Sequence, residues 1–270
     1  MRRTRVRRIF LDMPIALTIA GSDSSGGAGI QADLKTFHRF GVYGTSAITA
    51  ITAQNTLGVV DWKPVDTILV RRQIDAVVAD LRPHALKSGM LGTADIVGAV
   101  ADAVREHRLG PFVLDPVMVA TSGDPLLDPA AIDAIRHQLI PLSHLITPNL
   151  DEVAVLLGVR PTGEVAMCEA AEQLVRELRA GAALVKGGHL DGDQVIDVLF
   201  DGAMHVYRSA RIVTTSTHGT GCTLSAAIAA LLARGRPLPN AVEDALSFVR
   251  RAIQTAPGLG GGHGPLNHWA

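Results

Sequence analysis

The chain has 270 residues, of which 47% are hydrophobic and 19% are charged, so it can bury a large core and is not expected to be disordered. Its formal net charge of -1 gives no overall attraction for nucleic acid or an anionic membrane, and its two cysteines, Cys168 and Cys222, form no CxxC motif. No apolar stretch reaches the roughly 20 residues that a membrane-spanning helix needs, and small molecules are therefore the expected ligands.

The first twelve residues differ from the rest of the chain. They carry five arginines and one acid, and their apolar stretch is too short for the core of a signal peptide. Export is therefore not expected, and we predict a cytoplasmic protein. Because a strand pattern begins just after Met13, we expect residues 1–12 to form a disordered basic extension and residues 13–270 to form a single domain. A basic arm that contacts a polyanion is the alternative.

From Ile15 onward, short apolar segments of strand length alternate with amphipathic segments of helix length. The expected strands are 16–20, 46–52, 85–87, 112–114, 144–146 and 183–185, and the expected helices lie near 29–40, 67–80, 93–107, 129–139, 150–157 and 167–180. This alternation predicts βαβ units, hence an α/β fold with a mostly parallel sheet covered by helices on both faces. A hairpin pattern at 195–200 and 204–208 predicts an antiparallel edge. Ligands of such sheets bind at the carboxyl ends of the strands.

Polar side chains follow the first two expected strands. The glycine-rich segment 21–29 matches neither GxGxxG nor GxxxxGK[ST], which argues against a dinucleotide site and a P-loop. Within it, Asp23 is a candidate acceptor for a hydroxyl or a ring amine, although an aspartate there could simply cap the next helix. After the second strand, the Gln54 amide can donate and accept at once, as a ring with an amino group and ring nitrogens requires. Asn55 and Thr56 could equally mark an ordinary turn.

Charged side chains follow the later strands. Asp115 comes after one strand, and Asn149 and Glu152 come after the next. Carboxylate and amide oxygens suit Mg²⁺, which binds through one or two protein carboxylates together with waters and substrate phosphates. Asn149 could instead be only a helix cap. Lys186 ends a further strand and could neutralise a polyphosphate, or be an ordinary surface lysine.

The most informative motif lies near the C-terminus. An extended stretch, 210–217, leads into Gly219-Thr220-Gly221-Cys222, which a long helix-forming run follows. The free N–H groups and the positive dipole end of a helix favour an anion there, and we expect a phosphate. The same field is expected to lower the pKa of the Cys222 thiol, which could then accept a proton from a substrate hydroxyl. An ordinary loop with a small buried cysteine is the alternative.

A set of motifs runs through the chain from about Ile15 to Trp269. They are Ala16–Asp23, Gly26–Lys35, Ala53–Thr56, Lys87–Met90, Gly123–Leu127, Thr147–Asn149, Val185–His189 and Thr217–Ser225. Taken jointly, they resemble the hydroxymethylpyrimidine/phosphomethylpyrimidine kinases of thiamine biosynthesis, in the ribokinase-like superfamily. The resemblance implies a three-layer α/β/α domain that uses ATP and Mg²⁺. It also implies a homodimer that phosphorylates the hydroxymethyl alcohol of the pyrimidine and then the resulting monophosphate.

The resemblance further implies roles for individual residues, carried over by position in the motifs. They are Gln54 for the substrate ring, with Asp23, Met90 and Asp33 beside it; Gly219, Thr220 and Gly221 for the anion hole; Lys186, Asn149 and Asp115 for the nucleotide phosphates; Glu152 and Asp115 for Mg²⁺; and Cys222 for the base. Many sugar kinases of the superfamily have an aspartate at the base position, so the thiol is a departure. Its assignment depends on a lowered pKa.

Three other interpretations remain at this point. A pyridoxal or pyridoxine kinase of the same superfamily would act on a similar small ring with a hydroxymethyl group. A catalytically silent module that senses a nucleotide or a pyrimidine would keep the fold and lose the chemistry, although the presence of Cys222, Asn149 and Lys186 argues against it. A hydrolase with a nucleophilic cysteine would need a histidine beside Cys222, and only His218 is a candidate.

Overall fold

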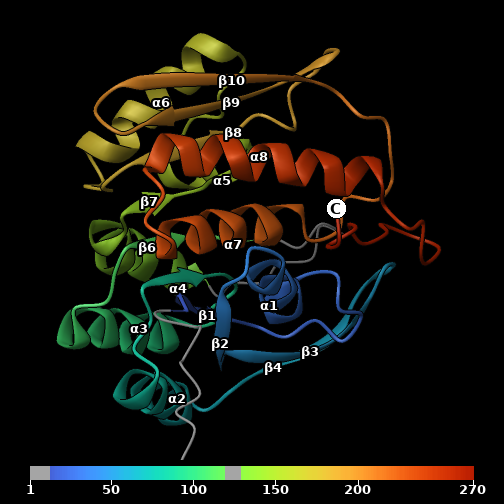
Figure 1. The fold of residues 1–270 in the computed structure, drawn as a ribbon. Coiled ribbons are helices and arrows are strands. Elements are labelled where there is room, and N and C mark those ends of the chain that lie inside the picture. Colours follow the sequence, from blue (N-terminus) through green and yellow to red (C-terminus); the bar gives the residue numbers. More distant parts are fainter. Residues whose placement is uncertain (1–12, 119–128) are drawn as a thin grey trace, which may run out of the picture.

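The computed structural model describes residues 13–118 and 129–270, and within those ranges the fold is built on one large sheet. The predicted extension 1–12 lies outside the described residues. The sheet strands are β1 Ile15–Ala20, β2 Tyr43–Ile48, β5 Ala85–Ser88, β6 Phe112–Leu114, β7 Leu145–Ile146, β8 Ala183–Lys186, β9 Gln194–Phe200 and β10 Met204–Ala210. Their spatial order is β10-β9-β8-β7-β6-β5-β1-β2 (Figure 1). Neighbouring strands from β8 to β2 are parallel, whereas β9 and β10 form the predicted antiparallel edge.

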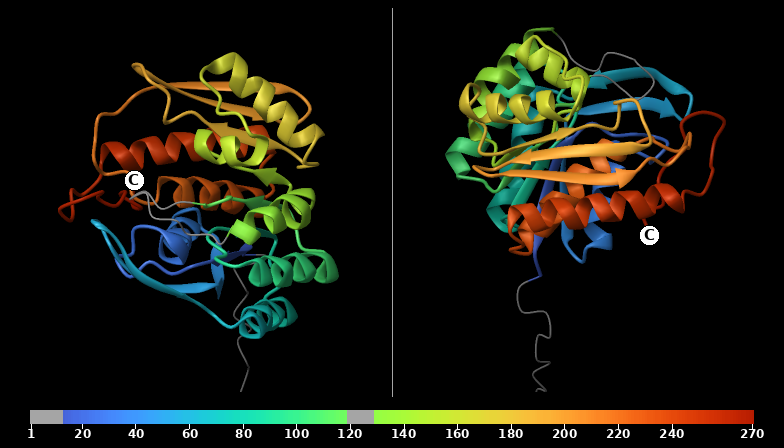
Figure 2. Two further views of the ribbon diagram at one scale, coloured as in Figure 1. Left: turned by 180° about the vertical axis from the view of Figure 1, so that it is seen from behind. Right: turned by 90° about the horizontal axis from the view of Figure 1, so that it is seen from above.

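Helices cover both faces of this sheet, as the alternating pattern predicts (Figures 1 and 2). They are α1 Gly29–Arg39, α2 Thr67–Asp80, α3 Ala94–His107, α4 Pro129–Ala134, α5 Leu150–Leu157, α6 Glu164–Arg176, α7 Thr220–Ala233 and α8 Leu238–Gln254. A π-helical turn, Ile135–Leu139, and a short 3-10 helix, Ile140–Leu142, continue α4. Helices α1, α7 and α8 pack on one face, and α2 to α6 pack on the other. Within the described ranges, no helix combines the length and apolar character needed to cross a membrane.

The core lies in two layers because successive strand residues point to opposite faces. In β6, Phe112 and Leu114 belong to the cluster under α2 to α6, whereas Val113 belongs to the cluster under α1, α7 and α8. All three side chains are buried. This two-sided burial explains why the parallel strands are continuous apolar runs in the sequence, and it confirms the predicted three-layer α/β/α architecture.

The sequence patterns missed some elements. The expected strand 46–52 is in fact the end of β2 and the start of β3, Ala50–Asn55. Strand β3 pairs antiparallel with β4, Gly58–Pro64, to which no element was assigned. Helix α8 was also missed, and the expected extended stretch 210–217 contains strand structure only at its first residue. The β3–β4 hairpin projects from the edge of the main sheet (Figure 1). Since much of β4 is exposed, it lacks the apolar pattern of a sheet strand.

The order of the strands identifies where a ligand can bind. Strand β1 lies between β2 and β5, so the chain passes from one side of β1 to the other. At such a switch point the loops after neighbouring strands diverge and leave a crevice. The loops that follow β1 and β5 begin with Gly21 and Gly89, and the hairpin stands beside them, since the Ser22 N–H donates to the Ala50 carbonyl oxygen at 2.8 Å.

Candidate active site

The start of α7 provides unpaired main-chain donors. Gly219 has a left-handed φ of +79° and begins the helix without a side-chain cap, and an added Cβ would overlap the carbonyl oxygen of Gly27. The N–H groups of Gly219, Gly221 and Cys222 have no hydrogen-bond partner among the described residues. Thr220 is different, because its N–H and its hydroxyl both donate to the Thr217 carbonyl oxygen, so the expected role of its N–H in an anion hole does not hold in this structure.

An ion pair lies next to these donors. The Lys186 ammonium is 3.1 Å from the Asp115 carboxylate, and a Cβ added to Gly221 would lie 3.4 Å from Lys186 Nζ and 3.6 Å from Asp115 Oδ2. Burial by itself would raise the pKa of Asp115, but the charges of Lys186 and Lys87 outweigh it and lower the pKa. Burial would likewise lower the pKa of Lys186, and the carboxylates of Asp115 and Glu152 raise it instead. Both groups are therefore charged beside an anion-attracting helix end.

Glu152 completes this group of charges. Its carboxylate lies 3.9 Å from Lys186 Nζ and accepts a hydrogen bond from the Asn149 N–H at 2.7 Å. Burial, followed by repulsion from Asp115, raises the pKa of Glu152 to about 7, although Lys186 acts in the opposite direction. The Asn149 side chain accepts from the N–H groups of Asp151 and Glu152, which makes a capping box at the start of α5. The helix-cap interpretation of Asn149 is therefore confirmed, and its cap holds Glu152 in place.

The donor set suits a magnesium ion that also binds phosphate. In the described part of the chain, no cluster of three His, Cys, Asp or Glu side chains could enclose a metal by itself. Two carboxylates, Asp115 and Glu152, lie within 4 Å of Lys186 Nζ, and Mg²⁺ usually takes one or two carboxylates from a protein. Asp115 is 1% exposed and already accepts from Thr147 and Ser225, so Glu152 is the more available oxygen ligand.

The structure contradicts the expected pKa of Cys222. Burial raises the pKa of this thiol to about 11, and the carboxylates of Asp33 and Asp115 add to the rise. The Lys87 charge and a hydrogen bond from the Gly29 N–H act in the opposite direction without reversing it. The helix end was expected to dominate, but desolvation of the thiolate is the larger effect here. Cys222 is therefore a thiol at neutral pH.

A buried ion pair lies beneath the site. Lys87 Nζ is 3.0 Å from Asp33 Oδ2, both side chains are 0% exposed, and the Thr18 hydroxyl donates to the same carboxylate at 2.6 Å. Asp33 was expected near the substrate, but with no exposed surface and both oxygens bonded it cannot contact a ligand directly. Lys87 was not singled out by sequence reasoning. A charged residue inside an otherwise apolar strand was the signal that could have found it.

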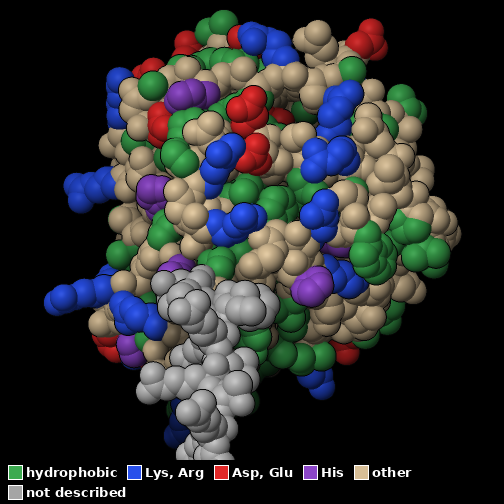
Figure 3. All heavy atoms as spheres, in the orientation of Figure 1, with side chains coloured by type: hydrophobic (Ala, Val, Ile, Leu, Met, Phe, Trp, Pro, Cys, Tyr) green, Lys and Arg blue, Asp and Glu red, His purple; other side chains and the backbone are tan. Residues whose placement is uncertain are grey.

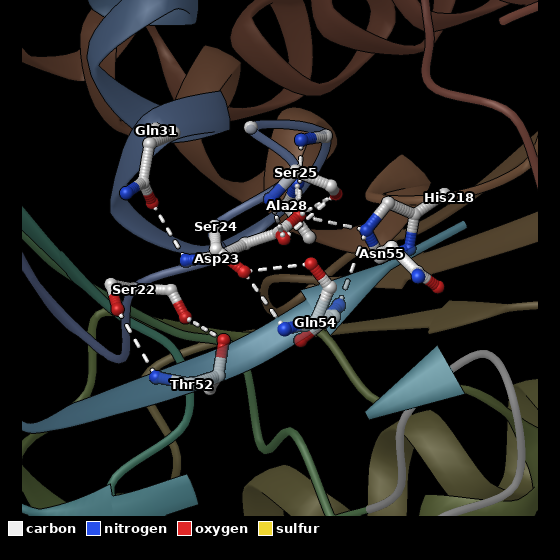
Figure 4. A network of polar contacts seen from close by, with 12 residues as sticks. Ser22, Asp23, Ser24, Ser25, Ala28, Gln31, Thr52, Gln54, Asn55 and His218 are labelled. Atoms are coloured by element: carbon white, nitrogen blue, oxygen red, sulfur yellow. Dashed lines mark hydrogen bonds and ion pairs between the residues drawn. The ribbon is translucent and has the colours of Figure 1, made fainter. Parts of the chain in front are cut away.

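The glycine-rich loop after β1 is organised around Asp23 (Figure 4). Its carboxylate accepts hydrogen bonds from the N–H groups of Ser25, Gly27 and Ala28 and from the Ser25 hydroxyl. Burial alone would raise the pKa of Asp23, but hydrogen bonds from His218, Ser25 and Ala28 hold it at about 2. The N–H groups of Ser25, Gly27 and Ala28 are therefore used within the loop, which favours the start of α7 as the place for a phosphate. Asp23 shapes the loop, and its oxygens are not free to accept from a substrate as predicted.

Gln54 and Met90 lie where a flat ring could bind. Both main-chain groups of Gln54 bond to the Ser24 hydroxyl, and its side-chain amide reaches toward His218 (Figure 4). Met90 packs with Ala50 and with the partly buried side chains Val59, Trp62 and Val117. An added Cβ on Gly21 would approach Met90 Sδ to 3.2 Å. Val59 of this cluster is paired with Gln54 across the β3–β4 hairpin, and an amide and apolar side chains are the kinds of group that a pocket for a heteroaromatic ring contains.

Comparison with known proteins shows which protein family this chain resembles. The family model described as phosphomethylpyrimidine kinase matches residues 23–267. A hydroxymethylpyrimidine/phosphomethylpyrimidine kinase of Haemophilus influenzae is 48% identical over 261 residues, which are 94% of this chain and 96% of the relative. The thiamine biosynthesis bifunctional protein ThiED of Geobacter sulfurreducens is 48% identical over 93% of this chain and 51% of its own length.

Among solved structures, an ADP complex of Bacillus subtilis pyridoxal kinase is similar, with a TM-score of 0.87 and 40% identity. The match covers 95% of this chain and 98% of that chain. The structural similarity therefore extends over almost the whole chain.

Proposed function

The chain belongs to the phosphomethylpyrimidine kinase family, and from this premise we propose how its site works. The enzyme uses ATP to phosphorylate 4-amino-5-hydroxymethyl-2-methylpyrimidine and then the monophosphate, a reaction of thiamine biosynthesis. The observation that supports this site is the set of unpaired N–H groups at the start of α7, next to the Lys186 and Asp115 pair. We assign the work to one kinase domain, residues 13–270, because β1 and β10 belong to the same sheet.

The proposed mechanism depends on positioning and charge. In phosphoryl transfer, charge spreads over the peripheral oxygens of the transferred group in a loose transition state. The N–H groups of Gly219, Gly221 and Cys222 would donate to those oxygens, and Lys186 would offset the charge on the leaving diphosphate. Glu152, with Asp115 behind it, would hold a magnesium ion, which neutralises phosphate charge when it is bound. Cys222 is a thiol at rest, so it would first have to release its own proton to solvent, and the thiolate would then accept the proton of the attacking hydroxyl.

We propose that the pyrimidine ring lies against Met90 and that the Gln54 amide recognises its nitrogens. The small apolar cluster around Met90 supports this placement, because it offers contact to one face of a ring while the amide offers polar groups at its edge. In this proposal Asp23 and Asp33 act indirectly. Asp23 holds the loop that precedes α1, and Asp33 holds the buried Lys87 beneath the site.

Phosphorus NMR tests the two successive transfers. Enzyme, ATP, magnesium chloride and hydroxymethylpyrimidine are mixed, and spectra are recorded over time. The monophosphate is expected first and the diphosphate later, because the second reaction consumes the product of the first. ADP formation without either product would contradict the proposed substrate.

Pyridoxal phosphorylation is the second candidate, since a pyridoxal kinase shares 40% identity and the same fold with this chain. Parallel assays with pyridoxal, pyridoxine and hydroxymethylpyrimidine compare kcat/KM directly. We expect the pyrimidine to be the preferred substrate. A higher kcat/KM for pyridoxal or pyridoxine would reverse this assignment.

We further propose a homodimer that forms through the β3–β4 hairpin. Ile51, Leu57 and Val60 on this hairpin are 53%, 71% and 78% exposed, and Leu259 of the C-terminal tail is 60% exposed. Figure 3 shows apolar side chains gathered on the side where Figure 1 draws the tip of the hairpin and the tail. An apolar patch at an exposed sheet ribbon is typical of an interface between protein chains.

The dimer is tested by light scattering of the wild type and of Val60→Glu. The wild type is expected at twice the mass of one chain, and the variant at the mass of a single chain, because a charge would be buried without a partner. Val165→Glu, at a 73% exposed valine on α6, which Figure 1 shows far from the hairpin, is the matched control and should leave the dimer intact. A monomeric wild type would refute the proposal.

A cytoplasmic location is proposed as well. Cys168 and Cys222 are both free thiols, and thiols persist in a reducing compartment.

A further inference from the structure

His218 joins three segments that are far apart in the sequence. It directly precedes Gly219, and its side chain is only 8% exposed. Its Nε2 atom lies 2.8 Å from Asp23 Oδ2 and 3.2 Å from Gln54 Nε2 (Figure 4). The ring also covers Gly27, where an added Cβ would lie 2.5 Å from His218 Cδ2. The segment just before α7, where we propose that phosphate binds, therefore meets the loop after β1 and strand β3 at the imidazole of His218.

The contact with Asp23 determines which nitrogen of the imidazole carries hydrogen. Asp23 accepts hydrogen bonds from the Gly27 and Ala28 N–H groups through the same oxygen that faces His218. With its pKa held at about 2, this carboxylate is ionised at every working pH and can only accept. The hydrogen in the 2.8 Å contact must therefore belong to His218 Nε2.

A protonated Nε2 restricts the Gln54 amide in turn. A nitrogen that already carries hydrogen cannot accept a second hydrogen from the Gln54 NH₂ group, so the 3.2 Å contact between the two nitrogens would oppose two donors. The two ends of an amide have nearly the same shape, and a half-turn of the group exchanges its oxygen and nitrogen. After that half-turn, the single hydrogen of His218 Nε2 is shared between Asp23 Oδ2, at 2.8 Å, and Gln54 Oε1, at 3.2 Å, and the NH₂ group is directed away from the histidine.

We propose that His218 is a specificity-determining positioning residue, which holds the Gln54 amide with its NH₂ group toward the substrate ring. The amide then selects a ring that presents a hydrogen-bond acceptor, such as an unprotonated ring nitrogen, and it disfavours one that presents a C–H at that position. This inference rests on the proposed function, in which Gln54 contacts the pyrimidine. It adds that the selection is imposed by Asp23 and His218, neither of which needs to touch the substrate.

The kinetic test uses substrate analogues in which each ring nitrogen is replaced in turn by C–H. For the wild type, kcat/KM on one of the two analogues should fall by about tenfold or more, because a buried donor is left unpaired. In His218→Leu the donor to the amide is lost, so this ratio should approach one through a rise in KM for the parent pyrimidine. His218→Gln keeps an N–H donor and should recover part of the ratio. His38→Leu, at an exposed histidine in the last turn of α1, is the matched control.

The outcomes separate this inference from the proposed function. If the wild type does not phosphorylate the pyrimidine, the proposed function fails. If it does, and His218→Leu lowers kcat/KM for parent and analogue by the same factor, His218 is merely structural and the inference is wrong. A ¹⁵N spectrum of histidine-labelled wild type, assigned through the signal that His218→Gln lacks, supplies a test that needs no active variant. A His218 Nε2 without hydrogen near pH 7 would overturn the inference.

Discussion

Replacing Gly219 by alanine is expected to lower kcat by about 100-fold or more, because removal of a single oxyanion donor already costs about that much. Gly219 has a φ of +79°, and its Cβ would overlap the Gly27 carbonyl oxygen, so the turn must open. Opening it displaces Gly221, which lies beside the Lys186 ammonium, and with it the N–H group of the next residue, Cys222. Positioned donors lose most of their effect when they move by about 1 Å. Steady-state kinetics with saturating ATP and pyrimidine measures the loss.

Gly235→Ala is the matched control for this variant. Gly235 follows the same helix α7 and has nearly the same φ, +78°, but nothing lies within 4 Å of an added Cβ. It therefore carries the same backbone strain without the collision, and its kcat should stay near that of the wild type. Thermal unfolding followed by circular dichroism shows whether both variants are folded. A folded Gly219→Ala enzyme with normal turnover would remove the start of α7 from the chemistry.

Replacing Cys222 by alanine is expected to lower kcat by about 100-fold, within the range that general-base catalysis contributes, while KM for ATP changes little. The reason is that the thiolate form of Cys222 accepts the proton of the attacking hydroxyl, whereas the side chain has no part in holding the nucleotide. Cys168→Ala is the control, because Cys168 is the other free cysteine and lies on α6, outside the site. Full turnover in Cys222→Ala would exclude Cys222 from proton transfer.

The pH dependence of kcat provides a second test of Cys222. With the pKa of the thiol raised to about 11, only roughly one molecule in ten thousand carries the thiolate at pH 7. If the thiolate is required, kcat of the wild type rises with pH between 7 and 9, and the alanine variant lacks this rise. The assay should stop near pH 9, because the folded enzyme becomes less stable above that pH. Because the pKa is higher in the folded state than its ordinary value of 9.0, this thiol contributes stability below pH 9 that is lost between pH 9 and about 11.

The separate positions of the two glycine-rich segments show how far sequence reasoning about a site can go. Both have glycines before a helix, and both could bind an anion on that evidence. In the structure the N–H groups of Ser25, Gly27 and Ala28 are already bonded to the Asp23 carboxylate, whereas those of Gly219, Gly221 and Cys222 have no partner among the described residues. Which segment has N–H groups free to bind an anion depends on the Asp23 carboxylate, which accepts hydrogen bonds from its own loop. No spacing of residues in the sequence reports that contact.

The sequence predicted the position of some charged residues correctly and that of Asp33 incorrectly. Asp115, Glu152 and Lys186 follow separate strands, and the parallel sheet brings them together as predicted because the strands end at one edge. Asp33 matched a family motif equally well, but its position on α1 turns it into the interior, where Lys87 neutralises it. The direction of a side chain relative to the core decides between these two outcomes.

The sequence by itself determined the three-layer fold, the kinase family and most of the residues that meet at the site. It could do so because the periodicity of apolar residues and the motifs at strand ends are local properties. Only the tertiary structure decided the protonation state of Cys222, the internal use of Asp23 and Asp33, and the joining of Gln54 to His218. Each of these depends on desolvation or on contacts between segments that are distant in the chain, and burial and hydrogen bonding change the energy of a charge only once those segments are packed together.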